Sequence, residues 1–258
     1  MLLQAPSQWR TVDFISDLHL QALEMKTFKT WQHYLQTTDA DAVFILGDLF
    51  EVWVGDDAIL PSSFDELCTQ TMRSASDRLT VHVMHGNRDF LMGPALMQTA
   101  RATLIADPTV LQFAGHRWLL THGDALCLAD TDYLAFREQV RSEAWQTTFL
   151  NKPLTERQTL ARQLRSQSEL RKKNGVAYAD VDADAADQLL LQWGAETMIH
   201  GHTHKPLHHA LGGVRSRWVL SDWDLDHSPI RADVLRITLD QPIPYRVDPI
   251  TQLPIKPG

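Results

Sequence analysis

One repeated order of residues constrains this chain more than any other feature. A short apolar run ends, and a polar motif rich in Asp, His or Asn follows directly. The motifs are Asp17-Leu18-His19, Gly47-Asp48, Gly86-Asn87-Arg88-Asp89, Thr121-His122-Gly123-Asp124 and His200-Gly201-His202-Thr203-His204. Because functional side chains gather at the carboxyl ends of strands in α/β sheets, we expect these motifs to meet at one edge.

The apolar runs before the motifs predict strands, and several of the segments between them predict helices. A run such as Ala42–Leu46 is almost continuously apolar, as is typical of a strand buried on both faces. Strands are expected at 12–16, 42–46, 80–84, 118–120, 197–199, 218–220 and 234–239. Helices are expected over 24–36, 64–79 and most of 130–193, and the proline-containing tail after Gln241 predicts irregular edge structure. The alternation indicates an α/β fold.

Composition narrows the class of protein. The chain has 258 residues, of which 44% are hydrophobic, which suits one large domain or a domain with an insertion. Its formal net charge of -8 argues against general nucleic-acid binding, and Cys68 and Cys127 indicate neither a disulfide framework nor a zinc–thiolate site. Residues 1–10 lack the apolar stretch of a signal peptide, and no apolar run approaches the roughly 20 residues that span a membrane. We therefore expect a soluble protein in a reducing compartment, at most lying on a membrane surface.

The polar motifs contain the side chains of a divalent metal site. Carboxylates, a carboxamide and imidazoles, without thiolates, suit ions such as Mn, Fe or Zn. Two such ions about 3.5–4 Å apart can clamp a phosphoryl group and activate water. The candidate ligands are Asp17, His19, Asp48, Asn87, His122, His202 and His204. We expect His200, Asp89 and Asp124 to orient these ligands rather than to bind metal.

Each motif also has an ordinary structural interpretation when it is taken alone. An Asp-x-His pair after a strand is common by chance, and Gly-Asp after an apolar run is usually a turn. The segment Asn87-Arg88-Asp89 is compatible with a helix cap beside a surface ion pair, and a histidine-rich loop can be solvated and inert. The five motifs in this order are more specific than any one of them.

In this order, the motifs resemble those of the calcineurin-like metallophosphoesterases. The resemblance implies a two-sheet β-sandwich flanked by helices and a site for two divalent metal ions. It divides the ligands into Asp17, His19, Asp48 and His204 on one ion, and Asp48, Asn87, His122 and His202 on the other. We expect catalysis to depend on Asp48, Asn87, Arg88 and His122.

Arg88 departs from the usual family pattern, which has His after Gly-Asn near the leaving group. Without a His acid there, the site suits a leaving group that needs little protonation, such as a phosphate monoester expelled from a pyrophosphate. With Arg88, the extended motifs resemble one subgroup, the UDP-2,3-diacylglucosamine pyrophosphatases of lipid A biosynthesis in Gram-negative bacteria. These motifs are 14–20, 47–51, 86–91, 122–127 and 200–206, in a match from about Thr11 to Leu239. The resemblance implies release of UMP and 2,3-diacylglucosamine 1-phosphate (lipid X), with activated water attacking the uridine-side phosphorus.

A segment that metal binding does not require lies between His122 and the histidine-rich motif. We expect a core formed by residues 1–129 and 194–258, and an inserted helical cap formed by residues 130–193. From Arg137 to Lys173 the segment has nine basic and four acidic residues, and it also carries apolar residues such as Trp145 and Phe149. A phosphate-bearing lipid or an anionic membrane surface would fit it, and so would an ordinary amphipathic helix pair.

The resemblance assigns this cap to the substrate, with an apolar chamber for acyl chains. Substrate contacts are then expected at Asn87, Arg88, Asp130, Tyr133, Ser168, Lys172, Lys173 and His202. The resemblance also implies Mn2+ as the metal and a peripheral position on the cytoplasmic face of the inner membrane. It implies neither a nucleic acid as a binding partner nor an obligate protein partner.

Two other functions share many of these features. Another calcineurin-like phosphoesterase, acting on soluble nucleotides or dinucleoside polyphosphates, would have the same ligands and differ only in the cap. A scaffold protein could keep the fold without catalysis, but such proteins lose metal ligands, and every ligand position is filled here.

Overall fold

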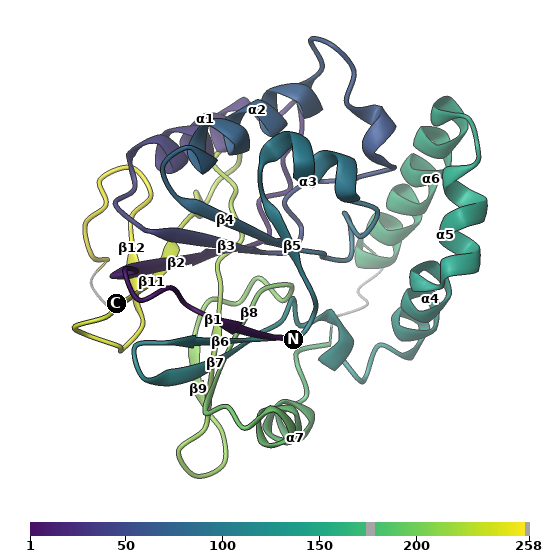
Figure 1. Ribbon diagram of the computed structural model, residues 1–258. Coiled ribbons are helices and arrows are strands. Elements are labelled where there is room, and N and C mark those ends of the chain that lie inside the picture. Colours follow the sequence, from purple (N-terminus) through teal and green to yellow (C-terminus); the bar gives the residue numbers. More distant parts are fainter. Residues whose placement is uncertain (174–178, 256–258) are drawn as a thin grey trace.

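Two six-stranded sheets form the centre of the molecule in the computed structural model, which describes residues 1–173 and 179–255, with side chains described outside 166–178 (Figure 1). The first sheet has the order β1 (Leu2–Gln4), β6 (Thr109–Phe113), β7 (His116–Leu120), β8 (Thr197–His200), β10 (Ser216–Val219) and β9 (His208–Ala210). The second has the order β12 (Tyr245–Val247), β11 (Val234–Thr238), β2 (Thr11–Ile15), β3 (Ala42–Leu46), β4 (Thr80–Met84) and β5 (Thr103–Ile105).

The apolar strands pack on both of their faces, as their sequences predict. In β3, Phe44 and Leu46 point into the cluster between the sheets, while Val43 and Ile45 point into the cluster beneath the helices. Between the sheets, the Phe14 ring stacks on that of Phe44 with centroids 5.4 Å apart. This burial on both faces explains why the run has no polar alternation.

Helices cover both outer faces of the sandwich. In Figure 1, α1 (Met25–Thr37), α2 (Phe64–Ser76) and α3 (Pro94–Ala100) lie on the second sheet, and α7 (Ala183–Trp193) lies on the first. The buried side of α7 joins a cluster with Val110, Leu119 and Met198 of the first sheet. The predicted α/β two-sheet sandwich flanked by helices is therefore confirmed.

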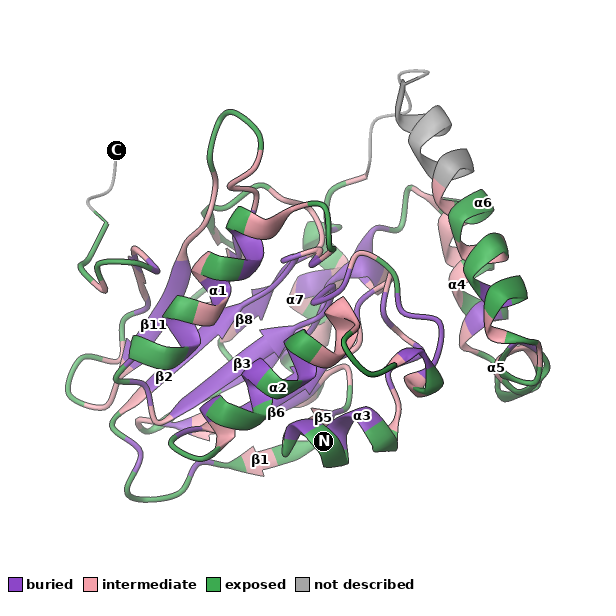
Figure 2. Cartoon of the chain, turned by 90° about the horizontal axis from the view of Figure 1, so that it is seen from above, coloured by how far each residue is buried: buried purple, intermediate pink, exposed green. Residues whose placement is uncertain are grey.

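Three further helices, α4 (Thr131–Arg141), α5 (Glu143–Leu150) and α6 (Leu154–Lys173), stand beside the sandwich. Figure 2 shows that α4, α5 and residues 154–165 of α6 are largely exposed or half-buried, whereas the strands of the sandwich are mostly buried. The cap of residues 130–193 stays a prediction. Because α7 packs on the first sheet, we propose that the cap consists of α4 to α6 and that α7 belongs to the core.

The short edge strands were not predicted from the sequence. Four of these strands have only three residues each, too few to show a hydrophobic period; they are β1, β5, β9 and β12. The longer strand β6 is not followed directly by any of the five polar motifs. The tail that was expected to be irregular includes β12, which pairs with β11. Within the described ranges, 1–173 and 179–255, no helix is long and apolar enough to cross a membrane.

Candidate metal centre

All five polar motifs meet at one edge of the sandwich, where strands from both sheets end. The backbone N–H of Asp17, after β2, donates to the carbonyl of Gly47 after β3, with 3.1 Å between N and O. The N–H of Gly201, after β8, donates to the carbonyl of His122 after β7, also at 3.1 Å. The predicted convergence of the motifs is thus present in the structure.

The backbone of the candidate ligands is unusual. Asp17, His19, Asp48, His202 and His204 all have positive φ, between 48° and 67°. Non-glycine residues rarely adopt this left-handed conformation, and it persists only where the surrounding structure holds it in place. It turns each side chain back into the site directly after its strand.

Gly86 allows the second and third motifs to touch. A Cβ added at this residue would lie 2.1 Å from Oδ1 of Asp48 and 2.3 Å from its backbone nitrogen. Gly47 is equally confined, since a Cβ there would lie 2.5 Å from Nδ1 of His122. These two motifs need glycine because Asp48 and His122 occupy the space of a side chain.

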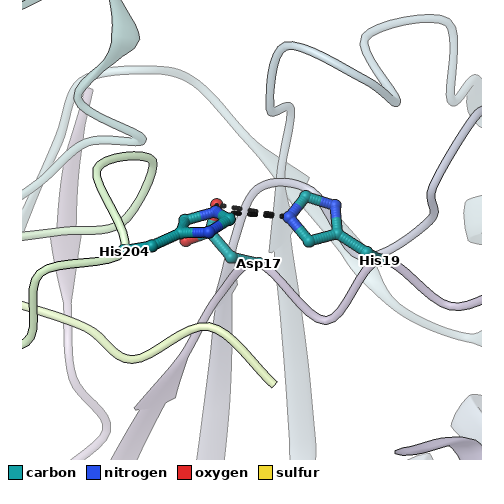
Figure 3. A group of neighbouring side chains, drawn as sticks. All are labelled: Asp17, His19 and His204. Atoms are coloured by element: carbon teal, nitrogen blue, oxygen red, sulfur yellow. Dashed lines mark hydrogen bonds and ion pairs between the residues drawn. The ribbon is translucent and has the colours of Figure 1, made fainter. Parts of the chain in front are cut away.

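Asp17, His19 and His204 form one group with facing ligand atoms (Figure 3). Oδ1 of Asp17 lies 3.3 Å from Nε2 of His204, and the Nε2 atoms of His19 and His204 are 3.3 Å apart. The other oxygen of Asp17 accepts hydrogen bonds from the Ser16 hydroxyl and the backbone N–H of His202. Asp17 is therefore fixed with Oδ1 directed at the two rings.

A second group joins Asp17, Asp48 and His122, and Asn87 and His202 border it. Nδ1 of His122 donates to the carbonyl of Leu46 at 2.9 Å, so in the neutral ring Nε2 carries the lone pair. That nitrogen lies 3.0 Å from Oδ1 of Asn87, which in turn lies 2.8 Å from Nδ1 of His202. Two acceptor atoms that face each other this closely need a proton or a cation between them.

The electrostatics of the site also favour positive charge. Burial alone would lower the pKa of His122, but the carboxylates of Asp48, Asp124 and Asp17 outweigh it and raise the pKa to about 9. The fully buried Oδ1 of Asp17 and Nδ1 of His19 have no hydrogen-bond partner. Oxygen and imidazole donors with unused lone pairs around a negative centre fit divalent metal ions well. The division of the ligands between two ions stays a prediction.

Two of the three residues expected to support the ligands, Asp89 and His200, bond the backbone of the motifs, whereas Asp124 accepts hydrogen bonds from Tyr133 and Arg137 of the cap. Asp89 accepts backbone N–H bonds from Leu49 at 2.7 Å and Gly86 at 2.8 Å, and so ties the second motif to the third. Burial and the neighbouring Asp48 raise its pKa to about 7. His200 donates to the carbonyl of Gly201, and burial lowers its pKa to about 4. It belongs to neither group of facing ligand atoms.

Arg88 lies inside the site. Its Nε is 3.5 Å from Oδ2 of Asp48, and its Nη1 donates to Oε2 of Glu51 at 2.5 Å. The guanidinium is half-buried, so its charge is only partly screened by water. A cation in this position can bind a phosphoryl oxygen beside the metal ligands.

Two functional neighbours were missed from the sequence, Glu51 and Asp222. Oδ2 of Asp222 lies 3.5 Å from Nδ1 of His204, and Arg231 holds the same carboxylate at 2.9 Å. Asp222 follows the apolar end of β10, which is the same order that marks the five motifs, so that order would have revealed it. Glu51 lies in the extended second motif but was not assigned a role.

The cap places Tyr133 over the site. Its ring stacks on His202 with centroids 5.9 Å apart, and its hydroxyl donates to Asp124. Asp130 caps α4 by accepting the backbone N–H of Tyr133 at 3.1 Å. The side chains of Ser168, Lys172 and Lys173 lie outside the described part of the structure, so their contacts stay predictions.

A cavity of about 430 Å³ opens among the cap helices. Most of its exposed wall is apolar, and its lining includes Phe136, Trp145, Phe149, Leu160 and Leu164. Lys152 also belongs to this lining, and its ammonium group donates to Oε1 of Glu156 at 2.6 Å. The size of the cavity lies within the range of about 300–1,000 Å³ typical of ligand sites.

Comparisons with known proteins agree with this geometry. The profile of the calcineurin-like phosphoesterase family matches residues 10–206. A UDP-2,3-diacylglucosamine hydrolase of Cellvibrio japonicus is 43% identical over 81% of this chain and 90% of its own length. Proteins of the same name from Ralstonia nicotianae and Chromobacterium violaceum are 40% and 43% identical, over 88% and 82% of this chain and 88% and 90% of their own lengths. The chain belongs to the calcineurin-like phosphoesterase family and, within it, to the group that these relatives form.

Proposed function

We propose that this calcineurin-like phosphoesterase hydrolyses the pyrophosphate of UDP-2,3-diacylglucosamine in lipid A biosynthesis. The products are UMP and 2,3-diacylglucosamine 1-phosphate. The observation that carries the proposal is the apolar cap cavity, which accompanies two groups of candidate metal ligands in a chain about 40% identical to hydrolases of this name. A phosphoesterase for soluble nucleotides has no need of such a cavity.

The residues of the core hold and orient the reacting pyrophosphate. Two divalent ions, held by Asp17, His19, Asp48, Asn87, His122, His202 and His204, would supply Lewis-acid activation of water and neutralise phosphoryl charge. Arg88 binds the phosphoryl oxygens beside Asp48 and stabilises the charge that grows on them. Because the leaving group is a phosphate monoester, it leaves without an acid at the position of Arg88.

The cap selects the lipid. The apolar cavity between α4, α5 and α6 takes acyl chains. Tyr133, stacked on His202, closes the site on the cap side. Asp130, Ser168, Lys172 and Lys173 are proposed to contact the glucosamine phosphate or its neighbours. We also propose Mn2+ as the metal and attachment to the inner membrane from its cytoplasmic face, without an obligate protein partner.

The test is product analysis with purified protein and Mn2+ in water labelled with heavy oxygen. Release of UMP from the lipid substrate, with the label in UMP, is expected because water attacks the uridine-side phosphorus. A label in the sugar phosphate would contradict the direction of attack. Turnover of UDP-N-acetylglucosamine or of a dinucleoside polyphosphate as fast as that of the lipid would contradict the role of the cap.

A further inference from the structure

Glu51 connects the metal centre to the cap through its two carboxylate oxygens. Oε2 accepts from Nη1 of Arg88 at 2.5 Å and lies 3.5 Å from Nδ1 of His19. Oε1 lies 2.5 Å from Nε of Arg165 on α6. One side chain thus touches a proposed substrate-binding arginine, a proposed metal ligand and the cap.

We propose that Glu51 is a positioning residue that couples the docking of α6 to the orientation of Arg88 and His19. The inference rests on the proposed function only for the role of Arg88 in binding phosphate. It goes beyond that function because it makes the cap part of the catalytic arrangement rather than a passive lipid chamber.

The geometry supports coupling because the three side chains restrain one another. The side chains of Arg88, Glu51 and Arg165 are 11%, 18% and 26% exposed, so water screens their attraction only in part. A guanidinium has several rotatable bonds, and a charge-assisted bond at one end fixes its plane. When α6 docks, the ion pair with Arg165 restrains Glu51, and the hydrogen bond that Arg88 donates to Glu51 in turn restrains the plane of Arg88.

The chain provides a matched control in a second ion pair between α6 and the core. Arg157 bonds the carboxylate of Asp57 and the carbonyl of Val54, and its side chain is almost fully buried. Asp57 lies in the 3-10 turn Asp56–Ala58 and contacts none of the candidate metal ligands among its described interactions. Loss of this pair should loosen α6 near Asp57 while the contact between Arg165 and Glu51 stays in place, so that Arg88 and His19 keep their neighbours.

The first experiment is a double-mutant cycle with Glu51→Gln and Arg165→Gln, with Asp57→Asn as control. Glu51→Gln should lower kcat for the lipid substrate about 10-fold or more, whereas Asp57→Asn should raise KM and change kcat less than about 3-fold. The effect of Arg165→Gln on kcat should disappear when Glu51 is already Gln. If the two effects on kcat multiply, Glu51 acts on Arg88 independently of Arg165 and the coupling is wrong. If Asp57→Asn lowers kcat as much as Glu51→Gln, kcat depends on the docking of α6 as a whole, and the specific role of the contact between Glu51 and Arg165 is wrong.

The second experiment uses no substrate, so it stays informative even if the proposed function fails. Amide hydrogen exchange in residues 154–165 should become faster in both Glu51→Gln and Asp57→Asn. Only Glu51→Gln should weaken the calorimetric affinity for Mn2+, by about 3- to 10-fold, because Glu51 lies beside His19 and Asp57 does not. Equal affinities in the two variants would overturn the link to His19. Glu51→Asp, which keeps the charge but shortens its reach, replaces Glu51→Gln if the latter does not fold.

Discussion

The core and the cap bring their polar residues to the site in different ways. In the core, Asp17, Asp48 and His122 are buried and follow strands directly, so the backbone of the sandwich fixes them. In the cap, long arginine side chains cross from helices that have little buried surface of their own. Val140 is the buried residue of α4, and Phe149 is that of α5. The site therefore has one side held by the fold and one side held by ion pairs.

The partners of these arginines change the interpretation of the basic segment from Arg137 to Lys173. Arg137 binds Asp124, Arg141 binds the carbonyl of Gly86, Arg157 binds Asp57, and Arg165 binds Glu51. These four positive charges face the acidic core of the same chain. Part of the positive excess thus serves to dock the cap, whereas the sequence alone is compatible with an anionic lipid or membrane surface as well as with an ordinary amphipathic helix pair. An excess of charge in a sequence indicates an opposite charge nearby without indicating which molecule carries it.

The largest expected effect comes from removing a carboxylate that the fold holds. Asp48→Ala should lower the release of UMP by about 10³-fold or more, because Asp48 faces both His122 and Arg88. Metal content per chain should fall as well, as element analysis would reveal. Asp187→Asn serves as the control, since Asp187 lies on α7 at the surface and accepts a hydrogen bond from Arg215. Full activity in Asp48→Ala would exclude the two-metal mechanism.

A backbone change in the core should have the next largest effect. Gly86→Ala places a methyl group 2.1 Å from Oδ1 of Asp48, so the second and third motifs must separate. A shift of about 1 Å in a catalytic group can lower activity about 10²-fold. Overpacking also lowers the free energy of unfolding by about 1–3 kcal/mol.

Gly115→Ala is the matched control for Gly86→Ala. Gly115 has a φ of 78° but has no atom within 4 Å of an added Cβ. Its substitution strains the backbone without displacing a ligand, so it should lower stability in urea and leave activity unchanged. Equal losses of activity in the two variants would mean that general destabilisation, rather than contact with Asp48, causes the effect.

The same contrast explains how much could be predicted from the sequence. The convergence of the candidate ligands in the core could be predicted because each motif follows an apolar run such as 42–46, and a buried strand leaves a clear local pattern. The cap contacts were not found, since Arg165 and Glu51 lie more than a hundred residues apart and no local pattern pairs them. The edge strands β1 and β9 were missed for a different reason, because three residues are too few for a period.

A change in the cap should affect binding more than chemistry. Arg157→Met removes the pair with Asp57 and keeps the apolar stem against the loop at Val54. KM for the lipid should rise about 3- to 10-fold with kcat nearly unchanged, because the loosened α6 weakens binding of substrate and transition state alike. Steady-state kinetics test this expectation, and hydrogen exchange should be faster in α6 than in β3. A kcat loss as large as that of Gly86→Ala would show that the cap is as rigidly coupled as the core.

The smallest expected effect concerns His82, which is buried between the two sheets of the core. His82 stacks on Phe44 with ring centroids 4.5 Å apart, and its Nδ1 has no hydrogen-bond partner. Burial lowers its pKa from 6.5 to about 4. Between these two values the unfolded chain binds a proton that the folded chain excludes, so stability falls as the pH drops below about 6.5.

This acid sensitivity can be isolated by comparing His82→Phe with the wild type. At about pH 5.5 proton uptake by the unfolded chain lowers the free energy of unfolding by about 1 kcal/mol, since one pKa unit corresponds to about 1.4 kcal/mol. Urea unfolding near neutral pH and at about pH 5.5 should therefore show a smaller loss of stability in His82→Phe, by that amount. The difference between the two pH values matters here, because the absolute stability also includes the fit of the new ring. An identical loss in both proteins would mean that the folded chain binds a proton at His82 as readily as the unfolded chain does, and the role of its burial would be wrong.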